Sequence, residues 1–226
     1  MALATKEAAD IGKMATAFPL FKKLKKEDLL KSMDDKNSDF KTVSKNVFKF
    51  INGDATLADK KEVMKKFCEK YKEKALAEIY SYTGANFSLK FPKDDNFDKL
   101  LKEKPAFVTE MRTLAEGFAY FGYDGFRAML RLLGSSIDFS VDFSKDKYPF
   151  SVTIAYVLCH LLKKRENFNE EKEKMYQHGL EYLKNESIGL PTKKIIVEML
   201  GLLDEKNKER LKNEQSLPAD VKSLLR

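Results

Sequence analysis

The chain contains few of the residues from which metal and redox sites are built. Its 226 residues include only two cysteines, Cys68 and Cys159, and two histidines, His160 and His178. The wide separation of the cysteines favours free thiols in a reducing compartment, packed as small apolar side chains, over a disulfide. A zinc site of Cys159, His160 and His178 is disfavoured because adjacent residues point to different faces of a helix. We expect no metal and no cofactor, with His160 partly buried and His178 at the surface.

Sequence patterns of catalysis are also lacking. The sequence has no phosphate loop, no dinucleotide-binding glycine fingerprint and no nucleophile elbow. A nucleophilic dyad of Cys159 and His160 fails because neighbours on a helix do not face each other. These absences favour a binding protein over an enzyme, with an enzyme of an unrecognised helical family as a third alternative.

Long apolar runs are missing as well. No run approaches the ~18 residues that a membrane-spanning helix needs. The longest candidate, 150–162, is followed by three cations and is typical of a buried helix. The N-terminus is charged and rich in alanine, unlike a secretory signal. We therefore expect no membrane insertion and, from these features, a cytoplasmic protein.

What the sequence does contain is apolar residues that recur every three or four positions. This spacing, with 43% apolar and 34% charged residues, predicts a folded and almost wholly α-helical protein. The expected helices are 2–17, 22–33, 40–51, 57–80, 105–121, 126–133, 149–165, 169–186, 191–202, 204–214 and 219–225. Gly84 is expected to end the helix at 57–80, and Gly122 and Gly125 to flank a break before the helix at 126–133.

Two segments alternate apolar and polar residues instead. The alternation is strict at 137–143 and weaker at 86–91, which predicts a short two-stranded ribbon between these segments. The loop that begins at Pro92 is expected to divide two lobes. The predicted fold is mainly α, with two helical lobes, a short β-ribbon and terminal arms. The predicted units are an N-terminal arm 1–21, a helical lobe 22–95, a helical lobe 96–215 and a C-terminal arm 216–226.

Positive charge is concentrated in the first third of the chain. The formal net charge is +7, and residues 1–75 alone hold 18 lysines against 12 acidic residues. A basic excess favours polyanionic partners such as nucleic acid. A lysine-rich solubilising surface explains the same excess equally well.

Arginine is scarce, so its placement is informative. Only six of the 42 basic residues are arginines, and Arg112, Arg127 and Arg131 lie within twenty residues of one another. The planar guanidinium binds phosphate through two hydrogen bonds, which lysine cannot do. Arg127 and Arg131 are four residues apart and share a helical face. In the alternative, these arginines pair with the nearby carboxylates of Glu110, Glu116 and Asp124.

Aromatic residues lie between these arginines. Tyr120 and Tyr123 are the candidates for stacking on bases, whereas Phe118, Phe121 and Phe126 are more typical of core residues. Two further basic patches are candidate phosphate contacts: Lys22, Lys23, Lys25 and Lys26, and then Lys163, Lys164 and Arg165. The second patch is equally well explained as cations at the C-terminal end of a helix.

Three segments give the chain a resemblance to a known family: Phe126–Ser136, 150–162 and Gly179–Tyr182. In order and character they resemble the nucleocapsid proteins of the bunyaviruses, of the tospovirus-like group. The resemblance implies a protein that wraps single-stranded RNA without sequence preference, encapsidates a viral genome, and occurs in the virion and the host cytoplasm. It also implies a viral polymerase as a further partner.

The same resemblance gives the chain ends a role in assembly. It implies that the arms pack on neighbouring protomers and build a ring or filament, a heterologous contact that repeats. The apolar residues expected to make these contacts are Phe18, Leu20, Phe21, Leu217, Val221, Leu224 and Leu225. The alternative function, from a different class, is a helical protein-interaction or scaffold domain with a lysine-rich surface.

Overall fold

The computed structural model describes residues 24–86, 90–92, 105–136, 147–165 and 168–225. Within these ranges the prediction of a mainly α fold is confirmed. The helices are α2 (Lys26–Asp34), α3 (Phe40–Asn52), α4 (Leu57–Tyr71), α5 (Glu73–Ala85), α7 (Pro105–Tyr120), α8 (Tyr123–Ser136), α9 (Phe150–Lys163), α10 (Asn169–Lys184), α11 (Leu190–Leu203), α12 (Lys206–Asn213) and α13 (Ala219–Leu224). The predicted helix 2–17 and the predicted strand 137–143 lie outside the described residues.

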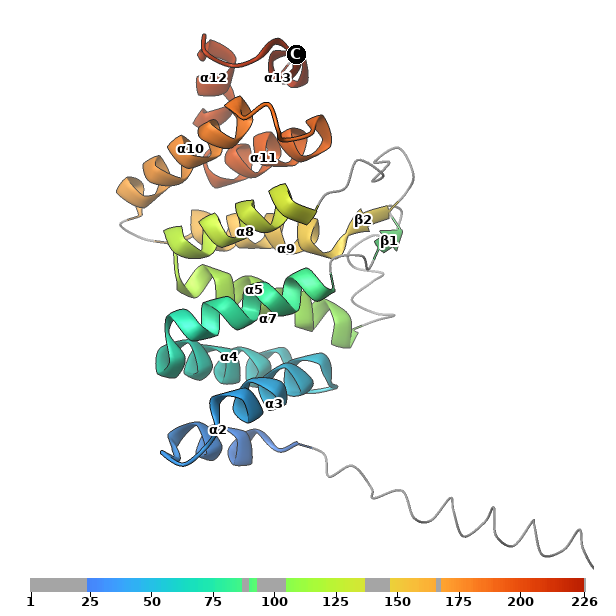
Figure 1. Ribbon diagram of the computed structural model, residues 1–226, viewed down its shortest axis with the longest axis vertical. Helices are drawn as coiled ribbons and strands as arrows, with labels where there is room; N and C mark the ends of the chain where they lie inside the picture. Colours follow the sequence, from blue (N-terminus) through green and yellow to red (C-terminus); the bar gives the residue numbers. More distant parts are fainter. Residues whose placement is uncertain (1–23, 87–89, 93–104, 137–146, 166–167, 226) are drawn as a thin grey trace, which may run out of the picture.

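The helices stack along one long axis, nearly in chain order. Helix α2 forms one end of the stack and α12 and α13 form the other, as Figure 1 shows. Helix α7 lies near the middle and packs against α4 on one side and α9 on the other. Its apolar side chains, such as Val108, Leu114 and Phe118, are fully buried. Buried side chains from Leu29 to Val221 form one cluster, so the two predicted lobes share a continuous core.

The predicted helix 57–80 is wrong as a single element. Helix α4 ends at Tyr71, Lys72 adopts a φ of 50°, and α5 begins at Glu73. The turn redirects the chain so that α5 packs on α7 and α8, with Ala75 and Ile79 buried. The apolar repeat continues across the turn, and therefore the sequence gives no sign of it. Gly84, which was predicted to end this helix, is the penultimate residue of α5.

The turn between α7 and α8 is shorter than predicted. Helix α8 begins at Tyr123, so only Phe121 and Gly122 connect the two helices. Gly122 has a φ of 55°, a left-handed conformation that favours glycine. Gly125 lies inside α8, where an added Cβ would be 1.9 Å from the carbonyl oxygen of Phe118. The absence of a side chain at Gly125 therefore allows the first turn of α8 to contact the backbone of α7.

The two-stranded ribbon is present, but its partners differ from the prediction. Strand β1 (Lys90–Pro92) pairs antiparallel with β2 (Lys147–Pro149), with Phe91 opposite Tyr148. The second strand thus begins after the alternating segment 137–143 that was expected to form it. The ribbon projects from one side of the helical stack (Figure 1).

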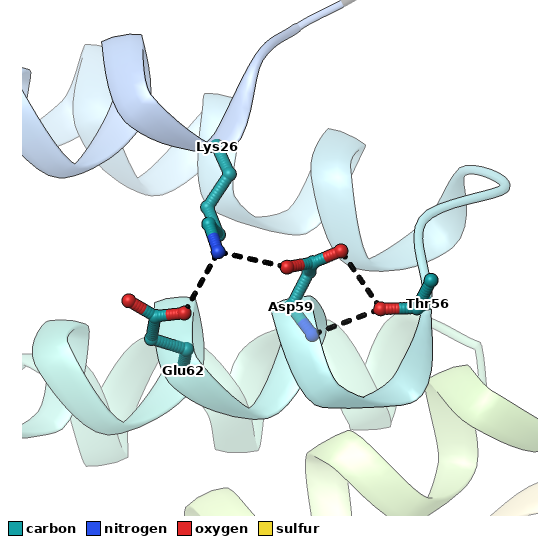
Figure 2. Close-up of polar contacts among 4 residues, drawn as sticks. All are labelled: Lys26, Thr56, Asp59 and Glu62. Atoms are coloured by element: carbon teal, nitrogen blue, oxygen red, sulfur yellow. Dashed lines mark hydrogen bonds and ion pairs between the residues drawn. The ribbon is translucent and has the colours of Figure 1, made fainter.

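Ion pairs attach helix α2 to α4. Lys26 Nζ lies 2.9 Å from Asp59 Oδ1 and 2.9 Å from Glu62 Oε2, and Figure 2 shows both contacts. The hydrogen bonds to these carboxylates raise the pKa of Lys26. Asp59 also accepts a hydrogen bond from the hydroxyl of Thr56, which caps the N-terminus of α4 by accepting from the Asp59 amide. Lys26 therefore joins α2 to the first turns of α4.

The predicted C-terminal arm belongs to the body of the fold. Leu217 and Val221 are buried in the common core, and Leu225 packs against it. Lys193 on α11, itself almost fully buried, forms a 3.1 Å ion pair with Asp220 on α13. The expectation that this segment is weakly tied to the core is wrong, because its apolar side chains are covered by their own chain.

A buried lysine joins α4 to the start of α7. The Nζ atom of Lys60 donates hydrogen bonds to Ala106 O at 3.1 Å and Thr109 Oγ1 at 2.7 Å. Its side chain is fully buried, and burial lowers the pKa of Lys60 below its ordinary value of 10.5. The nearby charge of Glu110 opposes this shift. While Lys60 remains protonated, removing its ammonium charge from water therefore makes the folded state less stable.

We predict that Gly125→Ala destabilises the protein by about 3 kcal/mol, because the new methyl group would overlap the Phe118 carbonyl in a tightly packed core. Urea unfolding followed by far-ultraviolet circular dichroism measures the change. Gly53→Ala is the matched control, since its nearest neighbour lies at 3.4 Å, and it should change stability by less than about 1 kcal/mol. Equal unfolding midpoints for the two variants would show that α7 and α8 are not in backbone contact.

We also predict that the parent protein gains stability relative to Lys60→Met as the pH rises towards 10.5. In this range the folded state loses the Lys60 proton while the unfolded chain still binds it, so the free energy of unfolding rises with pH. Urea unfolding of both proteins at pH 7 and near pH 10 measures the difference. The variant Lys31→Met, at an exposed lysine of α2, is the control. A pH-independent difference between parent and Lys60→Met would contradict the prediction.

Candidate nucleic-acid interface

Arg127 and Arg131 lie one turn apart on α8, and both are exposed. Arg127 Nη1 is 3.6 Å from Asp124 Oδ1, and both side chains of this pair are largely solvated. The guanidinium of Arg127 also lies 5.6 Å from the ring centroid of Tyr123. Arg131 forms no ion pair within the part of the chain that the structure describes. These two arginines therefore present guanidinium groups to solvent on a shared face, as the sequence predicts.

Aromatic rings from α8 and α10 lie beside these arginines. Tyr123 packs against His178 with a centroid separation of 6.1 Å, and His178 packs against Tyr182 at 5.3 Å. Burial raises the pKa of Tyr182, and the charges of Arg131 and Arg127 oppose this shift. The Tyr182 ring packs on α8 at Gly134, where an added Cβ would lie 3.3 Å from a ring carbon. We call the surface formed by Tyr123, Arg127, Arg131, His178 and Tyr182 the α8–α10 face. His178 is partly buried here and His160 is exposed, the reverse of the expectation.

Arg112 does not join this face through a direct contact. It is half-buried on α7, and within the described residues no hydrogen bond, ion pair or ring contact links it to Arg127 or Arg131. The carboxylates that the ion-pair alternative names are largely engaged elsewhere. Glu110 accepts a hydrogen bond from Tyr82, and Glu116 pairs with Lys61. Only the Asp124 pair with Arg127 matches that alternative in the described part of the chain.

A second basic and aromatic site lies between α4, α7 and α9. It is a cavity of about 340 Å³ with two of the predicted residues, Tyr120 and Arg165, in its wall. The other lining residues are Lys61, Met64, Lys65, Cys68, Glu116, Ala119 and Leu161. Lys61 and Lys65 were not predicted from the sequence, because they come from α4, more than fifty residues before Tyr120, and resemble solvated lysines of a helix face.

The turn between α7 and α8 separates the cavity from the α8–α10 face. Tyr120 precedes the turn and lines the cavity, whereas Tyr123 follows it and packs on α10. Arg165 lies over the turn, since a Cβ placed on Gly122 would be 3.3 Å from its Nη1. The guanidinium of Arg165 is also 5.8 Å from the ring centroid of Phe168. Cations and rings thus occur on both sides of Gly122.

The remaining predicted phosphate contacts are scattered. Lys22 and Lys23 lie outside the described residues. Lys25 is exposed just before α2, but Lys26 is held by two carboxylates and is a poor candidate for a phosphate contact. At the end of α9, Lys163 pairs with Glu205 at 2.8 Å, while Lys164 is exposed.

The residues expected to mediate assembly divide into two groups. Phe18, Leu20 and Phe21 lie outside the described residues. Leu217 and Val221 are buried in their own chain and, in this structure, are not exposed to a neighbouring protomer. Leu224 and Leu225 are partly buried at the end of the stack. An oligomer contact through these residues stays a prediction.

No group of three or more metal-ligating side chains occurs among the residues that the structure describes. None of the helices in the same ranges is long and apolar enough to cross a bilayer. The sequence matches no protein-family model, no curated protein and no solved structure.

Cys68 is a buried residue that lines the cavity, and the reactivity of its thiol is predictable. Burial raises its pKa to about 12, and burial also raises the pKa of Cys159. Because only the thiolate is nucleophilic, we expect both cysteines of the folded protein to resist labelling by a disulfide reagent such as dithionitrobenzoate at pH 8. Two thiols should react promptly once urea unfolds the chain. Rapid labelling of the native protein would contradict the observed burial.

Proposed function

We propose that this protein binds single-stranded RNA without sequence preference and that the α8–α10 face contacts the strand. The observation that carries the proposal is the pair of exposed guanidinium groups on α8, one turn apart, with the Tyr123 ring beside Arg127 and the Tyr182 ring packed on the same helix at Gly134. Guanidinium groups bind phosphates through two parallel hydrogen bonds. Aromatic rings stack on bases of any identity, because every base has a π face. A surface that carries both guanidinium groups and aromatic rings suits an unpaired strand, because the phosphates and the bases of such a strand are both accessible.

Assembly of several protomers on one strand is the further part of this proposal. It comes from the resemblance to bunyavirus nucleocapsid proteins, as do the choice of RNA over DNA, the encapsidation of a viral genome, the virion location and the polymerase partner. A ring or filament requires a heterologous contact that repeats between protomers. The remaining candidates for that contact are the segment before residue 22 and the partly buried Leu224 and Leu225, since Leu217 and Val221 are buried.

A helical scaffold domain remains the second candidate. This function is favoured because lysines in the first third of the chain, where the basic excess occurs, form ion pairs within the protein. Lys26, Lys61 and Lys66 each lie within 2.9 Å of a carboxylate oxygen on a neighbouring helix, so part of that excess serves to hold the stack together. The scaffold predicts little RNA affinity at physiological salt, and a purified protein with no excess absorbance at 260 nm.

The test replaces both guanidinium groups and measures RNA binding directly. We expect Arg127→Gln with Arg131→Gln to weaken binding of a fluorescein-labelled 20-nucleotide RNA at least about ten-fold in fluorescence anisotropy, through loss of two charge-assisted contacts. The slope of log K against log salt should become shallower by about 1.4, since each phosphate contact to a single strand contributes about 0.7.

The matched control is Lys194→Gln with Lys206→Gln, which removes the same charge from exposed positions at α11 and α12. This control should bind like the parent. If the arginine variant and the lysine variant lose the same affinity, only net charge matters and the α8–α10 face is not the site. Full binding by the arginine variant, with its circular dichroism spectrum unchanged, would overturn the proposal outright.

A further inference from the structure

The cavity between α4, α7 and α9 combines features that a phosphate-bearing ring compound requires. Its lining includes the apolar residues Met64, Ala119 and Leu161 together with Tyr120. Its cations are Lys61, Lys65 and Arg165. The volume of about 340 Å³ lies at the lower end of the range for ligand pockets, about 300–1,000 Å³. The cavity therefore suits one small ligand with an apolar face and a negative charge.

The three cations of the cavity differ in how far nearby carboxylates neutralise them. Lys61 and Glu116 pair with each other at 2.5 Å and largely neutralise one another. Lys65 has only a loose 3.8 Å contact with Glu69, one turn along the same helix, and its side chain is mostly solvated. Arg165 is exposed and forms no ion pair among the residues that the structure describes. The Glu171 carboxylate also lies at the Gly122 turn, 2.6 Å from the position of a Cβ on that glycine. Lys65 and Arg165 are thus the less neutralised cations of this cavity, and an anion there would compete with Glu69 and Glu171 for them.

The position of the cavity relates it to the proposed RNA-binding face. Arg165 lies over Gly122 at the turn between α7 and α8, and Tyr123 begins the α8–α10 face on the other side of that turn. Tyr120 and Tyr123 are three residues apart, but Tyr120 lines the cavity and Tyr123 belongs to the α8–α10 face. A strand that follows the arginines of α8 would reach the cavity by crossing this turn.

We infer that this cavity holds one nucleotide, with its base against Tyr120 and the apolar wall and its phosphate between Lys65 and Arg165. As a place for one unit of a bound RNA strand, the inference rests on the proposed function. As a binding site for a free nucleoside 5′-monophosphate, it is testable by itself. Base contacts with a ring and apolar side chains are tolerant of base identity, so all four nucleotides should bind.

The experiment is isothermal titration calorimetry of the full chain with adenosine, guanosine, cytidine and uridine 5′-monophosphates. Ribose 5-phosphate and inorganic phosphate are the comparison ligands. We expect each nucleotide to bind about ten-fold or more tightly than ribose 5-phosphate, because base stacking contributes on this scale. Equal affinity for nucleotides and ribose 5-phosphate would reduce the cavity to a phosphate site and overturn the inference.

Variants assign the binding to this cavity. Lys65→Gln with Arg165→Gln should weaken nucleotide binding about ten-fold or more, and Tyr120→Leu should weaken it while Tyr120→Phe preserves it. The pair Lys194→Gln with Lys206→Gln removes equal charge elsewhere and should bind nucleotides like the parent. Unaltered nucleotide affinity in the Lys65 and Arg165 variant, with an unchanged circular dichroism spectrum, would place the binding at another site.

The two proposals fail separately. If nucleotides bind no better than ribose 5-phosphate while RNA binding still requires Arg127 and Arg131, the inference about the cavity is wrong and the proposed function stands. If nucleotides bind in the cavity but RNA affinity does not depend on those arginines, the cavity is a nucleotide site and the α8–α10 face is not the RNA site.

Discussion

The close contact between α7 and α8 is the constraint on which both candidate sites depend. Only two residues connect these helices, and Gly125 allows the α8 backbone to approach the Phe118 carbonyl. Helix α7 is itself fixed between α4 and α9 by fully buried apolar side chains. The orientation of α8, and therefore the direction in which Arg127 and Arg131 point, follows from that packing. A side chain at position 125 would separate the helices and displace the arginines from Tyr182 on α10.

Charge in this protein serves two different purposes, and geometry separates them. Lysines of the first third, such as Lys26 and Lys66, lie within 2.9 Å of carboxylates on the adjacent helix, and Lys60 is buried against backbone and hydroxyl oxygens. These contacts hold α2, α4 and α7 together. The arginines of α8 contribute little to such packing, because they are exposed and the one carboxylate contact they make within the described ranges is long and solvated. The net charge of a segment therefore overstates how much uncompensated positive charge is exposed near α2, and it does not reveal the exposed guanidinium groups of α8.

Much of the fold follows from the sequence, because apolar periodicity fixes helices that bury one face. The bounds of α3, α7 and α11 differ from the expected ranges by one residue at most. What the periodicity cannot show is a turn that preserves it, as at Lys72, or which faces meet. The shared face of Arg127 and Arg131 follows from their spacing alone. Tyr182 and His178 belong to the α8–α10 face only because α10 packs there, and Lys65 belongs to the cavity only because α4 packs there. In the same way, the carboxylates that bind Lys26 lie more than thirty residues away in the sequence.

The arrangement of rings and cations about Gly122 also bears on how a strand would bind. On the α8–α10 face the guanidinium groups are solvated and the rings are partly covered, which favours phosphate contacts that tolerate movement of the strand. The cavity is lined by Tyr120 together with apolar residues, which favours contact with a base. A base held there would fix the register of the strand relative to α8. Under the proposed function, the exposed arginines of α8 would supply salt-dependent attraction and the cavity would resist sliding of the strand.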